Sequence, residues 1–166
     1  MLNSIDNIIR SSKETSTYEC IVDFSFETEL LLCEVINVER SWLKANPNYI
    51  LSDEQEIKFS KLKLRREKGE PIAYIIGNRG FWTLDLKVKE RVLIPRPESE
   101  LNIELSLDLP LTNKADVLDL GTGSGALALA LASERKGWSI TGTDISTDAL
   151  KVAEFNKEYH RLNNVE

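Results

Sequence analysis

Two aspartates and a glycine-rich run in the second half of the sequence form the pattern with the clearest chemical meaning. Asp119 stands two positions before the run Gly121-Thr-Gly-Ser-Gly125, and Asp144 follows Gly121 by 23 residues. Glycines at a strand-to-helix turn permit a tight bend and let a ligand approach main-chain N–H groups with no Cβ in the way. An acid at the tip of the next strand can accept hydrogen bonds from both hydroxyls of a ribose. We therefore expect an adenosine-containing cofactor across the carboxyl ends of two strands.

The glycines alone leave other interpretations open. Gly121, Gly123 and Ala126 also satisfy the relaxed dinucleotide pattern G-x-G-x-x-[G/A], in which the loop cradles a pyrophosphate. The glycines could also serve close helix packing only, with Asp144 capping a loop. Asp119 favours a different cofactor, because a carboxylate two residues before the first glycine attracts an amino or sulfonium group and repels a pyrophosphate.

These residues need a βαβα unit to bring them together. Short apolar strands are expected at 117–120 and 139–143, and helices at 126–132 and 147–161, the second of them capped by Ser146. Strands and helices that alternate at this length predict a parallel sheet in an α/β fold. The carboxyl ends of its strands would carry the glycine run and Asp144.

The preceding residues differ in pattern. Residues 1–76 have helical periodicity, with a core-facing stripe at Leu30, Leu31, Leu32, Val35 and Ile36. Ser52 and Gln55 predict a capping box that opens a helix ending near Lys68, where Gly69 stops it. We expect that helix to bury Ile57, Phe59, Leu62 and Leu64. The segment is predicted to be a small helical bundle.

A period of two residues marks the next segment. Leu84, Leu86 and Val88 alternate with polar residues, so we expect a strand over 81–88 and, after a polar turn, a second strand over 92–94. We interpret 77–96 as a β-hairpin linker between a helical domain, 1–76, and a partial cofactor-binding domain, 97–166. The prolines at 95 and 97 end the hairpin and begin a helix that stops near Pro110.

Composition excludes several classes of protein. The 166 residues are 42% hydrophobic and 29% charged with a net charge of −6, as expected for a soluble globular chain with no overall attraction to nucleic acid or anionic membrane. No run of residues resembles a signal peptide or a membrane span, so we expect a cytoplasmic location. With one histidine, His160, and two cysteines, Cys20 and Cys33, we expect no metal site and no disulfide.

Several segments together carry a resemblance to a known family. The run 119–125, with the segment 143–146 (Thr-Asp-Ile-Ser) and the following Ala149, Ala153 and Asn156, resembles the cofactor half of a class I methyltransferase that uses S-adenosylmethionine. The segments G-E-P-I-A at 69–73 and I-P-R-P-E-S-E at 94–100 resemble the release factor glutamine methyltransferases (the PrmC, formerly HemK, family). The glycine loop is common to many methyltransferases, whereas the other two segments are specific to this family.

The resemblance implies a fold and an activity. It implies a helical substrate-recognition domain, a hairpin and a Rossmann-like methyltransferase domain that methylates the side-chain amide nitrogen of a glutamine. That glutamine lies in the Gly-Gly-Gln loop of class I peptide-chain release factors, the expected partners in translation termination, encountered near the ribosome. No membrane and no specific DNA binding are expected. The implied cofactor residues are Asp119, Gly121, Thr122, Gly123, Ser124, Gly125 and Asp144, and the substrate-region candidates are Arg96, Glu98 and Ser99.

One family motif is absent from these residues. The Asn-Pro-Pro-Tyr segment that holds the glutamine amide in this family does not occur, since no proline follows Pro110. We therefore assign no catalytic residue and expect the chain to be inactive alone, to bind S-adenosylmethionine poorly and to leave strand 117–120 as an exposed sheet edge. Two alternatives stay open: another amino-methyltransferase, such as one acting on DNA adenine, or a non-enzymatic binding module derived from a methyltransferase.

A basic run in the helical domain also has two interpretations. Six of the eleven residues from Lys58 to Lys68 are basic. They could dock an acidic surface of a release factor or RNA, or they could form a solvated helix face. We favour the solvated face.

Overall fold

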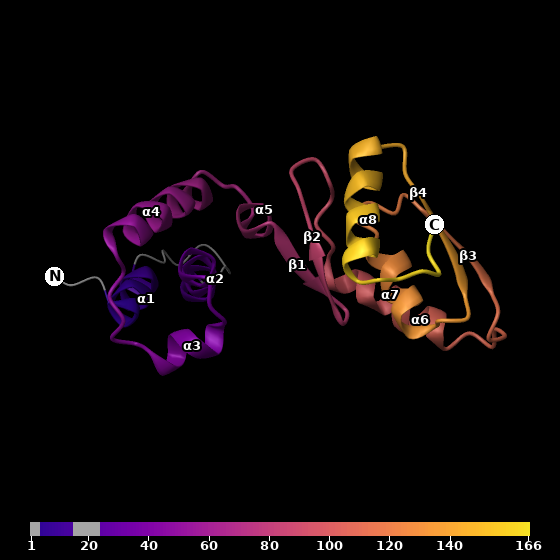
Figure 1. The fold of residues 1–166 in the computed structure, drawn as a ribbon, viewed down its shortest axis with the longest axis horizontal. Helices are drawn as coiled ribbons and strands as arrows, with labels where there is room; N and C mark the ends of the chain where they lie inside the picture. Colours follow the sequence, from indigo (N-terminus) through magenta and orange to yellow (C-terminus); the bar gives the residue numbers. More distant parts are fainter. Residues whose placement is uncertain (1–3, 15–23) are drawn as a thin grey trace. The chain divides into compact units, whose positions relative to one another are not determined.

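The structure is a computed structural model that describes residues 4–14 and 24–166. It divides into two compact units, Met1–Ile76 and Gly77–Glu166 (Figure 1). Each unit is described separately below. Cys20, one of the two cysteines, lies outside the described residues.

The first unit is helical, as predicted. Its helices are α1 (Ile5–Glu14), α2 (Phe24–Ile36), α3 (Arg40–Ala45), α4 (Asp53–Glu67) and α5 (Ile72–Ile76). Ile5, Leu32, Leu43 and Leu51 form its buried centre, with Cys33 packed against them. Burial raises the pKa of the Cys33 thiol, as expected for a cysteine that packs as a small apolar residue.

Helix α4 confirms the predicted cap and corrects the predicted face. The Gln55 amide donates to Ser52 Oγ at 3.3 Å, the Ser52 amide donates to Gln55 Oε1 at 3.0 Å, and Gly69 follows the helix with φ +90°. Ile57 and Leu64 are 56% and 51% exposed, so their predicted burial was wrong. The inner face instead carries Phe59 and Leu62 with the polar residues Gln55 and Arg66.

Arg66, one of the two polar residues on the inner face of α4, explains why the predicted buried face was wrong. The Arg66 guanidinium donates to a Glu27 carboxylate oxygen of α2 at 2.7 Å, and both side chains are largely shielded from solvent. Long side chains pack their aliphatic stems against a neighbouring helix while the charged end finds a partner. A prediction from apolar residues alone therefore identifies the wrong face of α4 as the buried one.

The hairpin has a different register from the predicted one. Strand β1 (Asn78–Phe81) pairs antiparallel with β2 (Leu84–Lys87) through a two-residue turn in which Trp82 has φ +54°. The alternating run is therefore the second strand, and the strand predicted at 92–94 was wrong. Val92 is instead buried against Ala149 and Val152. It lies at the start of a segment, residues 92–96, that belongs to no strand.

The rest of the second unit has the predicted α/β order. Its elements are a 3₁₀ turn (Pro97–Ser99), α6 (Glu100–Leu107), β3 (Asp116–Leu120), α7 (Ala126–Glu134), β4 (Ser139–Thr143) and α8 (Thr147–Tyr159). Strands β3 and β4 are parallel, with Val117 opposite Ile140 and Leu120 opposite Thr143. Ser146 Oγ accepts from the Ala149 amide at 3.2 Å, which confirms the predicted cap of α8.

Helices cover one face of this parallel pair in the described residues (Figure 1). On that face Ile140 is fully buried in a core that also contains Ile103 and Leu129, together with Phe81 and Leu86 of the hairpin. On the other face Leu118 and Leu120 are 59% and 76% exposed. Parallel sheets are normally covered on both faces, so this side of β3 is an uncovered apolar surface.

No helix within residues 4–14 and 24–166 combines the length and the apolar character that crossing a membrane requires.

Candidate functional site

The glycine run forms the turn between β3 and α7, and the surroundings of Gly121 and Gly125 give these two glycines different roles. Gly121, Gly123 and Gly125 have φ of +79°, +59° and +83°, a region that side chains with a Cβ rarely adopt. A Cβ on Gly121 would meet nothing within 4 Å, so this position is open to an approaching molecule. A Cβ on Gly125 would lie 2.9 Å from Leu129 Cδ1 and 3.2 Å from the Ala153 side chain. Gly125 therefore serves the packing of α7 against α8.

Main-chain N–H groups of the loop are already engaged. The Gly121 and Thr122 amides both donate to the Thr143 carbonyl at 2.8 Å, which ties the loop to the end of β4. The Gly123 amide donates to Asp144 Oδ2 at 2.9 Å. The loop is thus open sterically but does not aim these three donors at a ligand, contrary to the expectation from the sequence. A pyrophosphate cradle relies on such donors, so the geometry disfavours the dinucleotide interpretation.

Asp144 lies where the sequence placed it, beyond the end of β4 and against the loop. Its Oδ1 accepts from the Ser146 amide at 2.8 Å and its Oδ2 from the Gly123 amide. These backbone hydrogen bonds, that of Ser146 first, lower the pKa of Asp144. Each carboxylate oxygen can accept a second hydrogen bond. The residue is therefore a fixed anion that can still accept from the hydroxyls of a sugar.

Asp119 faces the same loop from the strand that precedes it. Thr122 Oγ1 donates to Asp119 Oδ2 at 2.7 Å, and Thr122 itself is buried. Gly142 lies opposite Asp119 in β4, and a Cβ there would come within 3.0 Å of Thr122 Oγ1. The Asp119 carboxylate is thereby oriented by a neighbour that has little room to move.

A cavity of about 360 Å³ joins these groups to the I-P-R-P segment. Arg96, Ser99, Asp119, Asp144 and the loop from Gly121 to Ser124 all line it. The cavity therefore brings together the general methyltransferase loop and the segment that the sequence identified as family-specific. Two of the three substrate-region candidates, Arg96 and Ser99, are in its wall. Glu98 is exposed to solvent and is not among the lining residues.

Arg91 lines the same cavity but was not a candidate from the sequence. It has φ +72° and directly precedes Val92, whose burial against α8 holds the segment in place. From the sequence, Arg91 is predicted to lie in a polar turn of the hairpin, and it is therefore not considered as a site residue. Its position beside the apolar Val92 and close to Pro95 and Pro97 could have indicated a role at the site.

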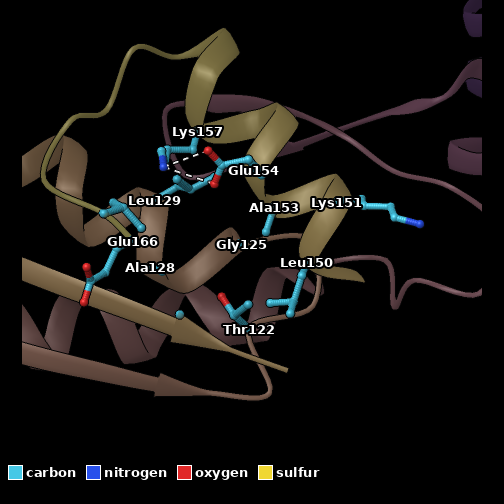
Figure 2. A pocket seen from close by; sticks show the side chains of 12 residues that line it. Thr122, Gly125, Ala128, Leu129, Leu150, Lys151, Ala153, Glu154, Lys157 and Glu166 are labelled. Atoms are coloured by element: carbon cyan, nitrogen blue, oxygen red, sulfur yellow. Dashed lines mark hydrogen bonds and ion pairs between the residues drawn. The ribbon is translucent and has the colours of Figure 1, made fainter. Parts of the chain in front are cut away.

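A second cavity, of about 440 Å³, lies between α7, α8 and β4 (Figure 2). Figure 2 shows Leu129, Leu150 and Ala153 directed into it, while Lys157 and Glu154 form an ion pair of 2.8 Å. Its wall is mainly apolar and contains neither Asp119 nor Asp144. A binding site for a polar cofactor needs convergent polar groups, so the cavity that contains both aspartates is the candidate site.

The basic run of α4 is largely paired within the first unit. Lys58 lies 3.3 Å from Glu34, and Lys63 lies 3.8 Å from Glu67. Arg65 and Arg66 form ion pairs with Glu70 and Glu27. Four of the six positive charges therefore have a carboxylate partner, which favours a solvated, internally paired helix face over an anion-binding patch.

His160, the single histidine of the sequence, makes a defined contact with the hairpin. Its Nε2 lies 2.9 Å from the Asp85 carbonyl of β2, so Nε2 carries the proton and donates. The ring thereby attaches the end of α8 to the hairpin, away from the candidate site.

Comparison with known proteins matches both units. Residues 21–77 match the family model of the PrmC N-terminal domain, and residues 111–166 match a methyltransferase domain model. The release factor glutamine methyltransferase of Aliivibrio fischeri is 43% identical over 98% of this chain. Those of Pseudomonas aeruginosa and Coxiella burnetii are 47% and 50% identical over 84% and 83% of it. The resemblance predicted from the sequence motifs is confirmed.

The chain spans about half the length of these relatives. It covers 57% of the Aliivibrio fischeri protein, 51% of that of Pseudomonas aeruginosa and 50% of that of Coxiella burnetii. Among solved structures, it is similar to coclaurine N-methyltransferase bound to N-methylheliamine and SAH, with a TM-score of 0.42 and 22% identity over 88% of this chain and 44% of that one. The N-terminal domain of human METTL16 gives a TM-score of 0.44 and 17% identity over 90% of this chain and 54% of that one.

Proposed function

We propose that this chain supplies the cofactor-binding part of a release factor glutamine methyltransferase and that its cofactor is S-adenosylmethionine. One observation carries the proposal: the glycine loop, Asp144 and the I-P-R-P segment line a single cavity of about 360 Å³. The curated relatives, which carry this name at 42–50% identity, support the choice of family.

The charges of the cavity fit the chemistry of that cofactor. S-adenosylmethionine has a positive sulfonium and amino group, a carboxylate and a ribose. Asp119 supplies an anion for the amino group, and Asp144 accepts from the ribose hydroxyls. Arg91 and Arg96 bring positive charge to the same wall for the carboxylate. The bound group would supply the methyl that is transferred.

Methyl transfer also requires that the acceptor be held in line with the methyl carbon. An amide nitrogen is a weak nucleophile, so positioning and hydrogen bonds to the glutamine amide carry most of the catalysis. The family's Asn-Pro-Pro-Tyr motif does not occur in these 166 residues. We therefore infer that these residues bind the cofactor weakly and need a further element to methylate the glutamine of a class I release factor.

Binding is tested by titration of S-adenosylhomocysteine into the full chain, followed by NMR at the loop amides. We expect saturable shifts at Gly121 and Gly123 in the wild-type chain. Asp144→Asn should weaken binding by roughly 10- to 100-fold, as expected for a lost charged acceptor. Asp148→Asn is the matched control, since Asp148 is an exposed residue of α8 whose partner is Lys151. Absence of any shift in the wild-type chain would contradict the proposed cofactor site.

Activity is tested with tritiated S-adenosylmethionine and a purified class I release factor. We expect no transfer by the 166 residues alone and robust transfer by the full-length Pseudomonas aeruginosa relative as the positive control. Transfer by the 166 residues would contradict the inferred need for a further element.

A further inference from the structure

Asn156 of α8 is a fully buried polar residue outside the candidate cavity. Its Nδ2 donates to the Ser124 carbonyl in the glycine loop at 2.9 Å and to the Lys87 carbonyl of β2 at 3.0 Å. Its Oδ1 accepts from the Lys87 amide at 2.8 Å. One side chain thus uses both of its N–H groups and its oxygen to join the loop to the hairpin.

Strand β2 has main-chain groups that do not bond to β1 and that Asn156 can bind instead. The Val88 amide donates to the Gly77 carbonyl at 3.1 Å. Because facing directions alternate in an antiparallel ladder, the N–H and C=O of the neighbouring residue Lys87 point away from β1. The Asn156 amide takes the place of a further strand at this edge. One turn later, directly after the end of α8, His160 Nε2 donates to the carbonyl of Asp85, which lies two residues before Lys87 on β2.

The loop end of this contact fixes one particular peptide group. The Ser124 carbonyl is directed to Asn156, and the Gly125 amide of the same peptide donates to the Thr122 carbonyl at 2.8 Å. The Ser124–Gly125 peptide is therefore held from both sides. Its orientation determines where Ser124 and Gly123, which line the cavity, present their main chain.

We propose that Asn156 is a positioning residue for the cofactor loop and couples it to the β-hairpin. This inference rests on the proposed function for the identity of the ligand, although the coupling itself does not depend on it. Loss of the Asn156 donors leaves the buried carbonyl of Ser124 and the partly buried carbonyl of Lys87 without this partner. The Ser124–Gly125 peptide then keeps only the hydrogen bond from the Gly125 amide to the Thr122 carbonyl, and the loop holds its ligand-binding shape less firmly.

Asn156→Asp is the discriminating variant because it has the same shape. The carboxylate still accepts from the Lys87 amide but cannot donate to either carbonyl. Burial at this position, where Asn156 is fully buried, raises the pKa of a carboxyl above that of an exposed aspartate, so that protonation near pH 5 restores one donor. Asn164→Asp is the matched control: Asn164 Nδ2 donates to the carbonyls of Arg135 and Trp138 in the same unit, at 3.2 and 3.1 Å, away from the loop.

Two measurements on the full chain test the proposal. The first is the protection factor of the Gly125 amide without ligand, which should fall about tenfold at pH 7.5 in Asn156→Asp and recover toward the wild-type value at pH 5. The second is the affinity for S-adenosylhomocysteine, which should weaken by a similar factor and recover over the same pH range. Asn164→Asp should change neither quantity by more than about twofold, even where it lowers the melting temperature as much.

The outcomes separate this inference from the proposed function. Unchanged Gly125 protection in Asn156→Asp at equal folded fraction would overturn the coupling, as would an equal loss in both variants. If the wild-type chain does not bind S-adenosylhomocysteine, the proposed cofactor fails, and the ligand-free exchange measurement alone decides the role of Asn156.

Discussion

Asp144 shows how a single residue links the loop to the pH behaviour of the site. Hydrogen bonds from the Ser146 and Gly123 amides lower the pKa of this carboxyl below its ordinary value. A group with a lowered folded-state pKa contributes stability above its unfolded pKa and loses that contribution as the pH falls through the folded pKa. The Asp144 contribution is therefore complete at neutral pH and is lost only under acid conditions.

From this we predict a flat pH dependence of ligand affinity. S-adenosylhomocysteine should bind the wild-type chain equally well between about pH 8 and pH 5, because Asp144 keeps its charge throughout this range. The decline should begin only below the ordinary aspartate pKa. NMR titrations at four pH values measure this, with the folded fraction monitored in the same spectra. An affinity that already falls between pH 7 and pH 6 would contradict the assignment.

Gly125 provides a second prediction at this scale. Gly125→Ala places a Cβ 2.9 Å from Leu129 Cδ1 in a backbone with φ +83°. Left-handed backbone strain and overpacking together should destabilise the second unit by about 2–4 kcal/mol. Urea unfolding followed by the NMR signal of the indole N–H of the buried Trp138 measures the loss.

Gly80→Ala is the matched control for this change. A Cβ at Gly80 would meet nothing within 4 Å, and its φ is not in the left-handed region. Its effect should stay within about 0.5 kcal/mol. An equal loss of stability in the two variants would show that the close approach of Leu129 is not the reason why position 125 requires glycine.

Single residues were predictable where local chemistry determines them. Asp119, Asp144, Gly121 and Gly123 were identified from spacing, and the structure brings them to one cavity, whereas Gly125, identified with them, is not among its lining residues. Arg91 and Asn156 were not assigned a role, because their positions depend on contacts with distant segments: Val92 with α8, and Asn156 with Lys87. A sequence pattern does not encode such pairs.

The capping box at the start of α4 provides a prediction at the scale of one helix. Ser52→Ala removes the acceptor for the Gln55 amide and breaks the reciprocal pair of capping hydrogen bonds. The first unit should lose about 1 kcal/mol of stability, and exchange in the first turn of α4 should increase. Thermal unfolding by circular dichroism together with hydrogen exchange measures both effects. Ser60→Ala, on the exposed side of the same helix, is the control and should leave both nearly unchanged.

The elements also show where periodicity succeeds and fails. Periodicity predicted β3, α7, β4 and α8 within a few residues, because strand, turn and cap signals agree there. It failed for the hairpin partner of β2, since Asn78–Phe81 contains a glycine and no alternation. Strand β1 has a weak local preference for strand structure. It forms because it pairs with β2 and because Phe81 is buried in the core, which are tertiary contacts.

The uncovered apolar face of β3 should make the second unit prone to self-association. Leu118 and Leu120 present apolar side chains on β3, and an open strand edge can pair with another chain. Leu120→Lys should therefore reduce aggregation at high concentration without loss of the fold. Static light scattering across a concentration series measures this.

Leu64→Lys is the control for charge. Leu64 is an exposed leucine of α4 in the first unit, and the substitution changes the net charge by the same amount. It should leave aggregation nearly unchanged. Equal suppression by both variants would show that net charge, rather than the face of β3, governs association.

The uncovered face also has a thermodynamic consequence. The heat-capacity change of unfolding depends mainly on the apolar area that folding removes from water. Because Leu118 and Leu120 stay in contact with water in the folded state, the second unit should have a smaller heat-capacity change than a fully enclosed domain of its length. Its free energy of unfolding should then vary less steeply with temperature than that of such a domain.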